Sequence, residues 1–190
     1  MSKRTIVGIG GTLRAGSSSE LLVRAVLARC AAHGAETRMF DGAALVRFAM
    51  FNVENSERTD DQRAFVDAVR RADGIVIGTP GYHGGVSGLV KNAIDLLEDV
   101  RSDSRPYFDG RPIGLIVSAA GWQAGGVTLS AMRDIVHAMR GWPTPIGIAI
   151  NSAEQRPFAP TGDLIDPAIA DLVDAQARQI MSFRMTELAA

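Results

Sequence analysis

Two kinds of segment alternate along the chain, each with its own spacing of apolar and polar residues. Short runs with the length of a strand occur at about residues 4–10, 35–40, 74–79, 112–119 and 146–150. Longer segments with apolar residues three or four positions apart occur at about 18–33, 58–72, 88–100, 128–140 and 166–185. The first pattern is typical of buried strands and the second of amphipathic helices. We therefore predict five strands that alternate with five helices.

The helical spacing is clearest in the first and fourth of these longer segments. In the first, Leu22, Val26 and Cys30 lie four residues apart, so a helix would place them on one face. In the fourth, the apolar face would consist of Leu129, Met132, Val136 and Met139. We expect both faces to pack in the core, and Cys30 to be a core residue rather than a reactive thiol.

Strands that alternate with helices favour a parallel sheet covered by helices on both faces. Five of each fit a single domain over residues 1–190, a flavodoxin-like doubly wound α/β fold with the strand order 2-1-3-4-5. The segments 41–57 and 101–110 show no clean period, so we expect them to be loops. In folds of this order, ligands bind outside the carboxyl ends of the strands, where the order reverses.

Composition narrows the class of protein. The chain has 190 residues, of which 46% are hydrophobic and 22% charged, as is ordinary for a soluble globular domain. A net charge of −1 gives no electrostatic reason to expect nucleic acid or an anionic membrane as a partner. The apolar runs are too short to span a membrane, and the N-terminus does not resemble a secretory signal. We therefore expect a cytoplasmic protein.

Cysteine and histidine usage limits the possible metal chemistry. Cys30 is the one cysteine of the sequence, which excludes an internal disulfide and a cysteine-ligated metal cluster. His33 and His137 have no Cys, Asp or Glu partner at the spacing of metal ligands, so we expect no metal site.

The loop after the first strand carries the first candidate chemistry. Gly8 and Gly10 begin a dinucleotide fingerprint, but Leu13 stands where its third glycine should be. Gly11 and Gly16 fit a P-loop, but Ser17 replaces its lysine. What is left at the start of a helix is a set suited to a phosphate monoester, namely Thr12, Arg14, Ser17, Ser18 and Ser19. The alternative is that Ser18 or Ser19 only caps the helix.

The loop after the third strand is rich in glycine and contains one aromatic residue, Tyr82. Its glycines allow close backbone contact with something flat, and they are Gly81, Gly84, Gly85 and Gly88. The backbone N–H groups of His83, Gly84 and Gly85 can meet the polar edge of a heteroaromatic ring. The alternative is a simple turn after a strand.

A third glycine-rich loop, residues 118–126, is expected between the fourth strand and its helix. Because strands one, three and four are neighbours in the expected order, the three loops would line one crevice. Together they predict a ligand with a phosphate at one end and a planar group at the other. Trp122 would either pack in the core or cover the planar group.

The motifs of the first two loops resemble those of the NADPH-dependent FMN reductase family. That family shows G-S-x-R-x-x-S-x-N after strand one, where this chain has residues 11–19, GTLRAGSSS. It shows P-x-Y-N-x-S-x-P-G-x-L-K-N-A-I-D after strand three, where this chain has residues 80–95, PGYHGGVSGLVKNAID. The departures are His83 for Asn, Gly85 for Ser, Ser87 for Pro and Ser19 for Asn. The resemblance covers about residues 4–150.

By this resemblance, the first loop holds the phosphate of FMN, the segment 80–85 wraps its isoalloxazine ring, and the loop from Ser118 closes the other side. The implied cofactor-binding residues are Thr12, Arg14, Ser17, Ser18, Ser19, Pro80, Gly81, Tyr82, His83, Gly84, Gly85, Ser118 and Gly121. The His83 side chain either acts as a charge switch beside the flavin or points to solvent, its backbone N–H alone being used.

The resemblance also implies an NAD(P)H-dependent reductase that passes hydride to N5 of FMN and then electrons to free flavin, quinone or a similar small acceptor. Because the cofactor carries this chemistry, no catalytic residue is expected. A homodimer or homotetramer is expected, and a flavin-dependent monooxygenase is a further candidate partner. A flavodoxin-type electron carrier is the alternative, although carriers are usually strongly acidic. A P-loop nucleotide enzyme is disfavoured by the missing lysine.

Overall fold

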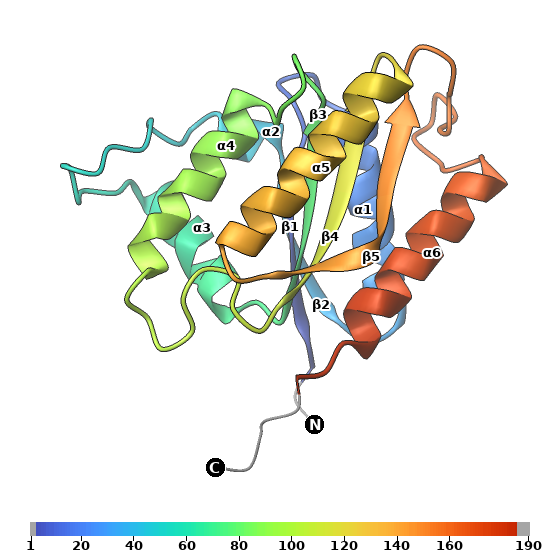
Figure 1. The fold of residues 1–190 in the computed structure, drawn as a ribbon. Helices are drawn as coiled ribbons and strands as arrows, with labels where there is room; N and C mark the ends of the chain where they lie inside the picture. Colours follow the sequence, from blue (N-terminus) through green and yellow to red (C-terminus); the bar gives the residue numbers. More distant parts are fainter. Residues whose placement is uncertain (1–2, 186–190) are drawn as a thin grey trace.

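Five parallel strands form one sheet in the order β2-β1-β3-β4-β5 (Figure 1), which confirms the predicted strand order. The computed structural model describes residues 3–185. The strands are β1 (Thr5–Gly10), β2 (Glu36–Phe40), β3 (Gly74–Pro80), β4 (Pro112–Ala119) and β5 (Trp142–Asn151). All seven residues of β3 are buried, as expected of a central strand covered on both sides.

Helices cover both faces of the sheet. One face carries α1 (Ser18–Ala32) and α6 (Pro167–Ser182), which lie against each other as well as the strands (Figure 1). The other carries α2 (Gly42–Leu45), α3 (Asp60–Arg71), α4 (Gly88–Asp95), the 3₁₀ helix η1 (Leu96–Val100) and α5 (Trp122–Ala138). None of the helices within residues 3–185 has the length and apolarity that crossing a membrane requires.

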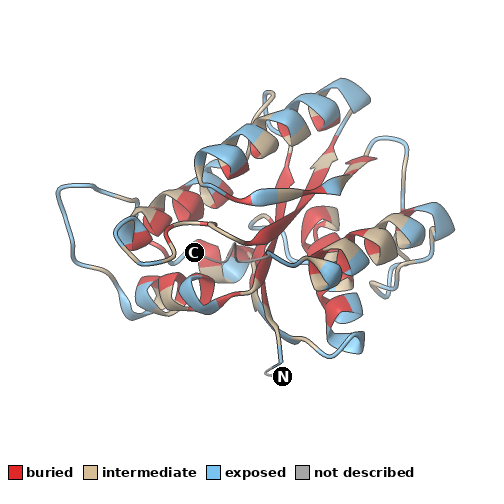
Figure 2. Ribbon diagram, turned by 60° about the horizontal axis from the view of Figure 1, so that its bottom comes forward, coloured by how far each residue is buried: buried red, intermediate tan, exposed pale blue. Residues whose placement is uncertain are grey.

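The core consists of two apolar layers, one on each face of the sheet (Figure 2). Leu22, Val26 and Cys30 are fully buried in the layer under α1 and α6, which confirms the predicted helix face. Burial raises the pKa of the Cys30 thiol to about 11, so it stays protonated at neutral pH, as suits a core residue. Met132 and Val136 of α5 are buried in the other layer, with Leu129 and Met139 packed at its edge.

Two elements begin earlier than the sequence predicts, and one expected loop contains a short helix. Helix α5 begins at Trp122 rather than near 128, so most of the expected loop 118–126 is helix. Gly125 is buried in its first turns, where an added Cβ would lie 3.7 Å from the Ala149 Cβ of β5. Packing against the sheet thus outweighs the weak helix propensity of glycine.

Strand β5 begins at Trp142 rather than 146. Its first residues include Pro143 and Pro145, which argue against a central strand, but β5 is an edge strand, where proline is tolerated. The expected loop 41–57 contains the short helix α2, whose first turn is capped by the Asp41 carboxylate accepting the Ala44 N–H at 3.1 Å.

Candidate functional site

A crevice of about 390 Å³ lies at the carboxyl end of the sheet, a size within the roughly 300–1,000 Å³ of small-molecule sites. Four strand-to-helix connections contribute to it, and its lining consists of Thr12, Arg14, Ser17, Ser18, Ser19, Pro80, Gly81, Tyr82, Ser118, Ala119, Ala120 and Ser152. The structure therefore brings together most of the residues singled out from the sequence. It leaves His83, Gly84, Gly85 and Gly121 outside the lining.

The start of α1 forms one wall of the crevice. Ser17 is its N-cap, with Oγ accepting the Glu20 N–H at 3.4 Å. The cap is thus Ser17, and the alternative that Ser18 or Ser19 only caps the helix is wrong. Ser17 and Ser19 are buried, with their hydroxyl oxygens 3.4 Å apart. Free N–H groups and the helix dipole make the start of a 15-residue helix a favourable place for an anion.

Arg14 lies at the rim of this wall with its side chain exposed. Its guanidinium makes no hydrogen bond or ion pair with any other residue from 3 to 185. Its backbone N–H, by contrast, donates to Thr12 Oγ1 at 3.0 Å, and that hydroxyl lies 3.3 Å from the Arg14 carbonyl oxygen. The Thr12 hydroxyl therefore holds the turn, while the Arg14 cation is available to an anion in the crevice.

One carboxylate near this wall would oppose an anion if it were not paired. Glu20 lies in the first turn of α1 and is largely buried. It accepts a hydrogen bond from Arg24 Nε at 2.9 Å, and Arg24 Nη2 in turn donates to Asp41 at 2.7 Å. This chain of charges balances Glu20 without using Arg14.

The connection between β3 and α4 forms the opposite wall. Gly81 donates its N–H to the Ser118 carbonyl at 2.9 Å, which ties this loop to the end of β4. A Cβ added at Gly81 would lie 2.9 Å from both Ala119 Cβ and Thr128 Oγ1, so a larger residue does not fit without a shift. Tyr82 lines the crevice with 56% of its surface exposed, which leaves its ring accessible.

A two-residue hairpin turn forms the tip of this loop. Tyr82 and Gly85 exchange both backbone hydrogen bonds, at 3.1 and 3.0 Å. Between them, His83 has φ +51° and Gly84 φ +81°, as a type I′ turn requires. Asn is favoured at the first of these positions, and His also tolerates positive φ. The Gly85 N–H is engaged inside the turn, whereas the N–H groups of His83 and Gly84 make no hydrogen bond with any residue from 3 to 185.

The remaining wall comes from the ends of β4 and β5. Ser152 follows the last residue of β5, and its N–H donates to the Ala119 carbonyl at 2.8 Å. Ala119, Ala120 and Ser152 were not singled out from the sequence. The rule that ligands bind at the carboxyl ends of parallel strands applies to β5 as well, and would have included Ser152.

Trp122 is neither a core residue nor part of the crevice lining. Its side chain is 55% exposed, and Nε1 donates to Glu154 Oε2 at 3.3 Å. Gly121, with φ +131°, is the N-cap that turns the chain into α5. The hydrogen bond between Trp122 and Glu154 therefore joins the connection after β4 to the connection after β5. It lies beside the crevice rather than over it.

Comparisons with known proteins identify the family and support the fold. The sequence model of a family described as NADPH-dependent FMN reductase matches residues 4–155. The FMN-dependent NADPH-azoreductase of Staphylococcus aureus is 28% identical over 148 residues, 76% of this chain and 75% of the azoreductase.

Solved structures share the fold. The flavoenzyme NAD(P)H:(acceptor) oxidoreductase FerB of Paracoccus denitrificans superimposes with a TM-score of 0.73 at 21% identity, covering 94% of this chain and 97% of FerB. A WrbA-like flavodoxin of Agrobacterium tumefaciens gives a TM-score of 0.56 at 18% identity, covering 95% and 96%. The predicted flavodoxin-like fold is confirmed.

Proposed function

We propose that this chain, which belongs to the NADPH-dependent FMN reductase family, binds FMN in the crevice, oxidises NADPH there and passes the electrons to a small acceptor. Family membership makes the protein an oxidoreductase. The observation that carries the proposal is the lining of one cavity, which joins the start of helix α1 to the adjoining ends of β3 and β4.

The phosphate of FMN suits the wall formed by α1. Ser17, Ser18 and Ser19 supply hydroxyl and N–H donors, and Arg14 supplies a free cation. The sequence lacks the second glycine fingerprint that a pyrophosphate would need. The proposal is therefore specific for FMN over FAD.

The planar part of the flavin suits the surface where the β3 and β4 connections meet. Pro80 and Gly81 lie there directly beside Ser118, Ala119 and Ala120, and all five residues line the crevice. These small residues position the ring and leave its exposed side open beside Tyr82. Bound FMN would supply hydride and electron transfer, so the protein supplies binding and orientation, and we assign no catalytic acid or base.

Two observations support the proposed acceptor, namely the open crevice and the similarity to an azoreductase. An open crevice admits nicotinamide and acceptor in turn, which fits a planar or soluble acceptor such as free flavin, a quinone or an azo compound. The similarity to an azoreductase favours a compound of this kind. A flavin-dependent monooxygenase that takes up reduced flavin is a further partner in this scheme.

The test is spectroscopic. The protein is purified, its flavin is released by heat and identified by chromatography, and the FMN-loaded protein is titrated without oxygen with NADPH and then with NADH. We expect FMN, and bleaching of its visible absorbance by NADPH without any added protein. FAD as the dominant flavin would contradict the site assignment. FMN that bleaches only when a separate reductase is added would favour the electron carrier.

We also propose that the protein is a homodimer or homotetramer through α4, η1 and the loop 101–110. A groove of about 360 Å³ lies beside these elements, lined in part by Phe51, Val53 and Tyr107. Val53 is 79% exposed there, an apolar side chain that a second copy would cover. Light scattering that finds only a monomer at working concentration would contradict this arrangement.

A further inference from the structure

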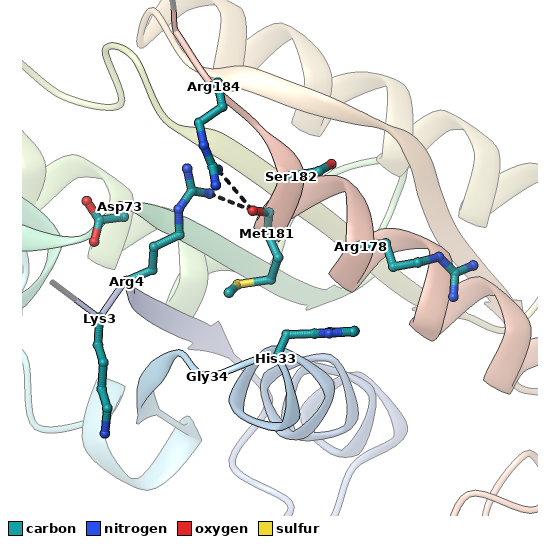
Figure 3. Close-up of a pocket in the computed structure, with 9 residues that line it drawn as sticks. All are labelled: Lys3, Arg4, His33, Gly34, Asp73, Arg178, Met181, Ser182 and Arg184. Carbon is teal, nitrogen blue, oxygen red and sulfur yellow. Dashed lines mark hydrogen bonds between the residues drawn. The ribbon is translucent and has the colours of Figure 1, made fainter. Parts of the chain in front are cut away.

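A second and larger cavity, of about 960 Å³, lies at the opposite, amino end of the sheet (Figure 3). It is formed where β1 begins and where α1 and α6 end. The six residues of β1 separate it from the crevice by about 20 Å, at roughly 3.3 Å per residue. Ligands of doubly wound folds bind at the other end of the sheet, so this cavity has no part in the chemistry proposed above.

The lining of this cavity is strongly basic, although the whole chain has a net charge of −1. Its permanent cations are Lys3, Arg4, Arg178 and Arg184, and the one carboxylate among its described lining residues is Asp73. That carboxylate accepts the Thr5 N–H at 2.8 Å, where it fixes the start of β1. The positive charges therefore outnumber the negative ones locally.

Two of the guanidiniums lie side by side on the same backbone oxygen. Arg4 Nη1 and Arg184 Nη1 each donate to the Met181 carbonyl, both at 3.1 Å (Figure 3). Burial and, next in size, the charge of Arg184 lower the pKa of Arg4, so the charged form of Arg4 is disfavoured at this place. Such a pair is stabilised when an anion lies against it.

Capping of α6 accounts for part of this cluster. Basic side chains are favourable at a helix C-terminus, and Arg4 donates to the carbonyls of Ile180, Met181 and Phe183. Capping does not account for Lys3 and Arg178, whose side chains make no hydrogen bond or ion pair with any residue that the structure describes. Among the residues from 3 to 185, Arg184 uses Nη1 alone, and its Nε and Nη2 make no hydrogen bond there.

We propose that this cavity binds a small anion that carries two or more phosphate groups, at a site separate from the FMN crevice. Lys3 and Arg178 extend to opposite sides of the Arg4–Arg184 pair (Figure 3). Charges spread in this way match an extended anion better than a single phosphate, which would need them to converge on one point. A bound anion would link the start of β1 to the ends of α1 and α6, and so would stabilise the fold.

The experiment titrates tripolyphosphate into FMN-saturated protein by calorimetry, at low and at high salt. We expect one saturable site whose affinity falls as salt rises. The double variant Arg178→Gln/Arg184→Gln, which leaves the capping residue Arg4 in place, should weaken binding by about tenfold or more. The matched control Arg38→Gln/Arg63→Gln removes two exposed charges elsewhere and should bind as the wild type does.

Three results would overturn the proposal. They are the absence of saturable binding, equal weakening in both double variants, and binding of an oligonucleotide without binding of tripolyphosphate. In this experiment FMN keeps the crevice occupied. If the protein does not bind FMN, the titration is repeated with the Arg14→Ala variant, in which the cation of the crevice is absent. Failure of the proposed function and failure of this proposal are therefore separate outcomes.

Discussion

The two ends of the sheet handle charge in opposite ways, because all five strands run in the same direction. At the carboxyl end helices begin, and their free N–H groups favour anions, so the crevice needs only hydroxyls, glycines and the single cation of Arg14. At the amino end helices finish, and their free carbonyls recruit arginines. A ligand at the first end can be bound by backbone, whereas a ligand at the second has to be bound by side-chain charge.

Arg111 is an example, at the amino end, of an arginine whose partners are backbone carbonyls. It is fully buried, and its guanidinium donates to the carbonyls of Ala72, Tyr107 and Arg70. Burial lowers its pKa to about 10, so it keeps its charge at neutral pH. No carboxylate pairs with Arg111 among the residues from 3 to 185. Backbone carbonyls alone solvate this cation, just as backbone N–H groups are expected to help solvate an anion at the other end.

The largest expected effect follows from removing that cation. Arg111→Leu removes a donor from the carbonyls of Arg70, Tyr107 and Ala72, and we expect a loss of about 3 kcal/mol in the free energy of unfolding, measured with urea. Arg63→Leu, an exposed change outside the proposed interface, should stay within about 0.5 kcal/mol of the wild type. A loss below about 1 kcal/mol for Arg111→Leu would show that Arg105, which already donates to the Ala72 carbonyl, takes over.

The matching change at the carboxyl end should affect binding and not folding. Arg14 is exposed, and its guanidinium makes no hydrogen bond or ion pair with any other described residue, so Arg14→Ala should leave the unfolding midpoint unchanged. It should weaken FMN by about ten- to a hundredfold, since a charge-assisted contact is worth roughly 1.5–3 kcal/mol. Riboflavin, which lacks the phosphate, should bind the variant as it binds the wild type. Equal weakening of both ligands would remove Arg14 from the phosphate end.

The two ends also differ in how far sequence predicts them. The carboxyl end depends on local motifs, so the loop of Arg14 and Ser17 and the buried run of β3 could be identified directly. The start of α5 could not, because two glycines in its first turns imitate a loop and only packing against β5 outweighs them. Arg111 offers no signal at all, since its burial depends on carbonyls some 40 residues earlier in the chain.

The smallest expected effect concerns His83, where the sequence left two interpretations open. Its side chain is exposed and lies outside the crevice lining, while its backbone, at φ +51°, holds the first central position of the turn. This geometry favours the interpretation in which only the backbone matters.

His83→Asn keeps a residue that suits positive φ, so we expect FMN affinity, reduction potential and the pH dependence of that potential to stay as they are. His83→Val removes the imidazole equally well but puts a β-branched residue at positive φ, a strain of about 1–3 kcal/mol that should weaken FMN. If the imidazole acts as a charge switch instead, both variants should lose the same pH-dependent step in the potential, and His83→Asn would then no longer match the wild type.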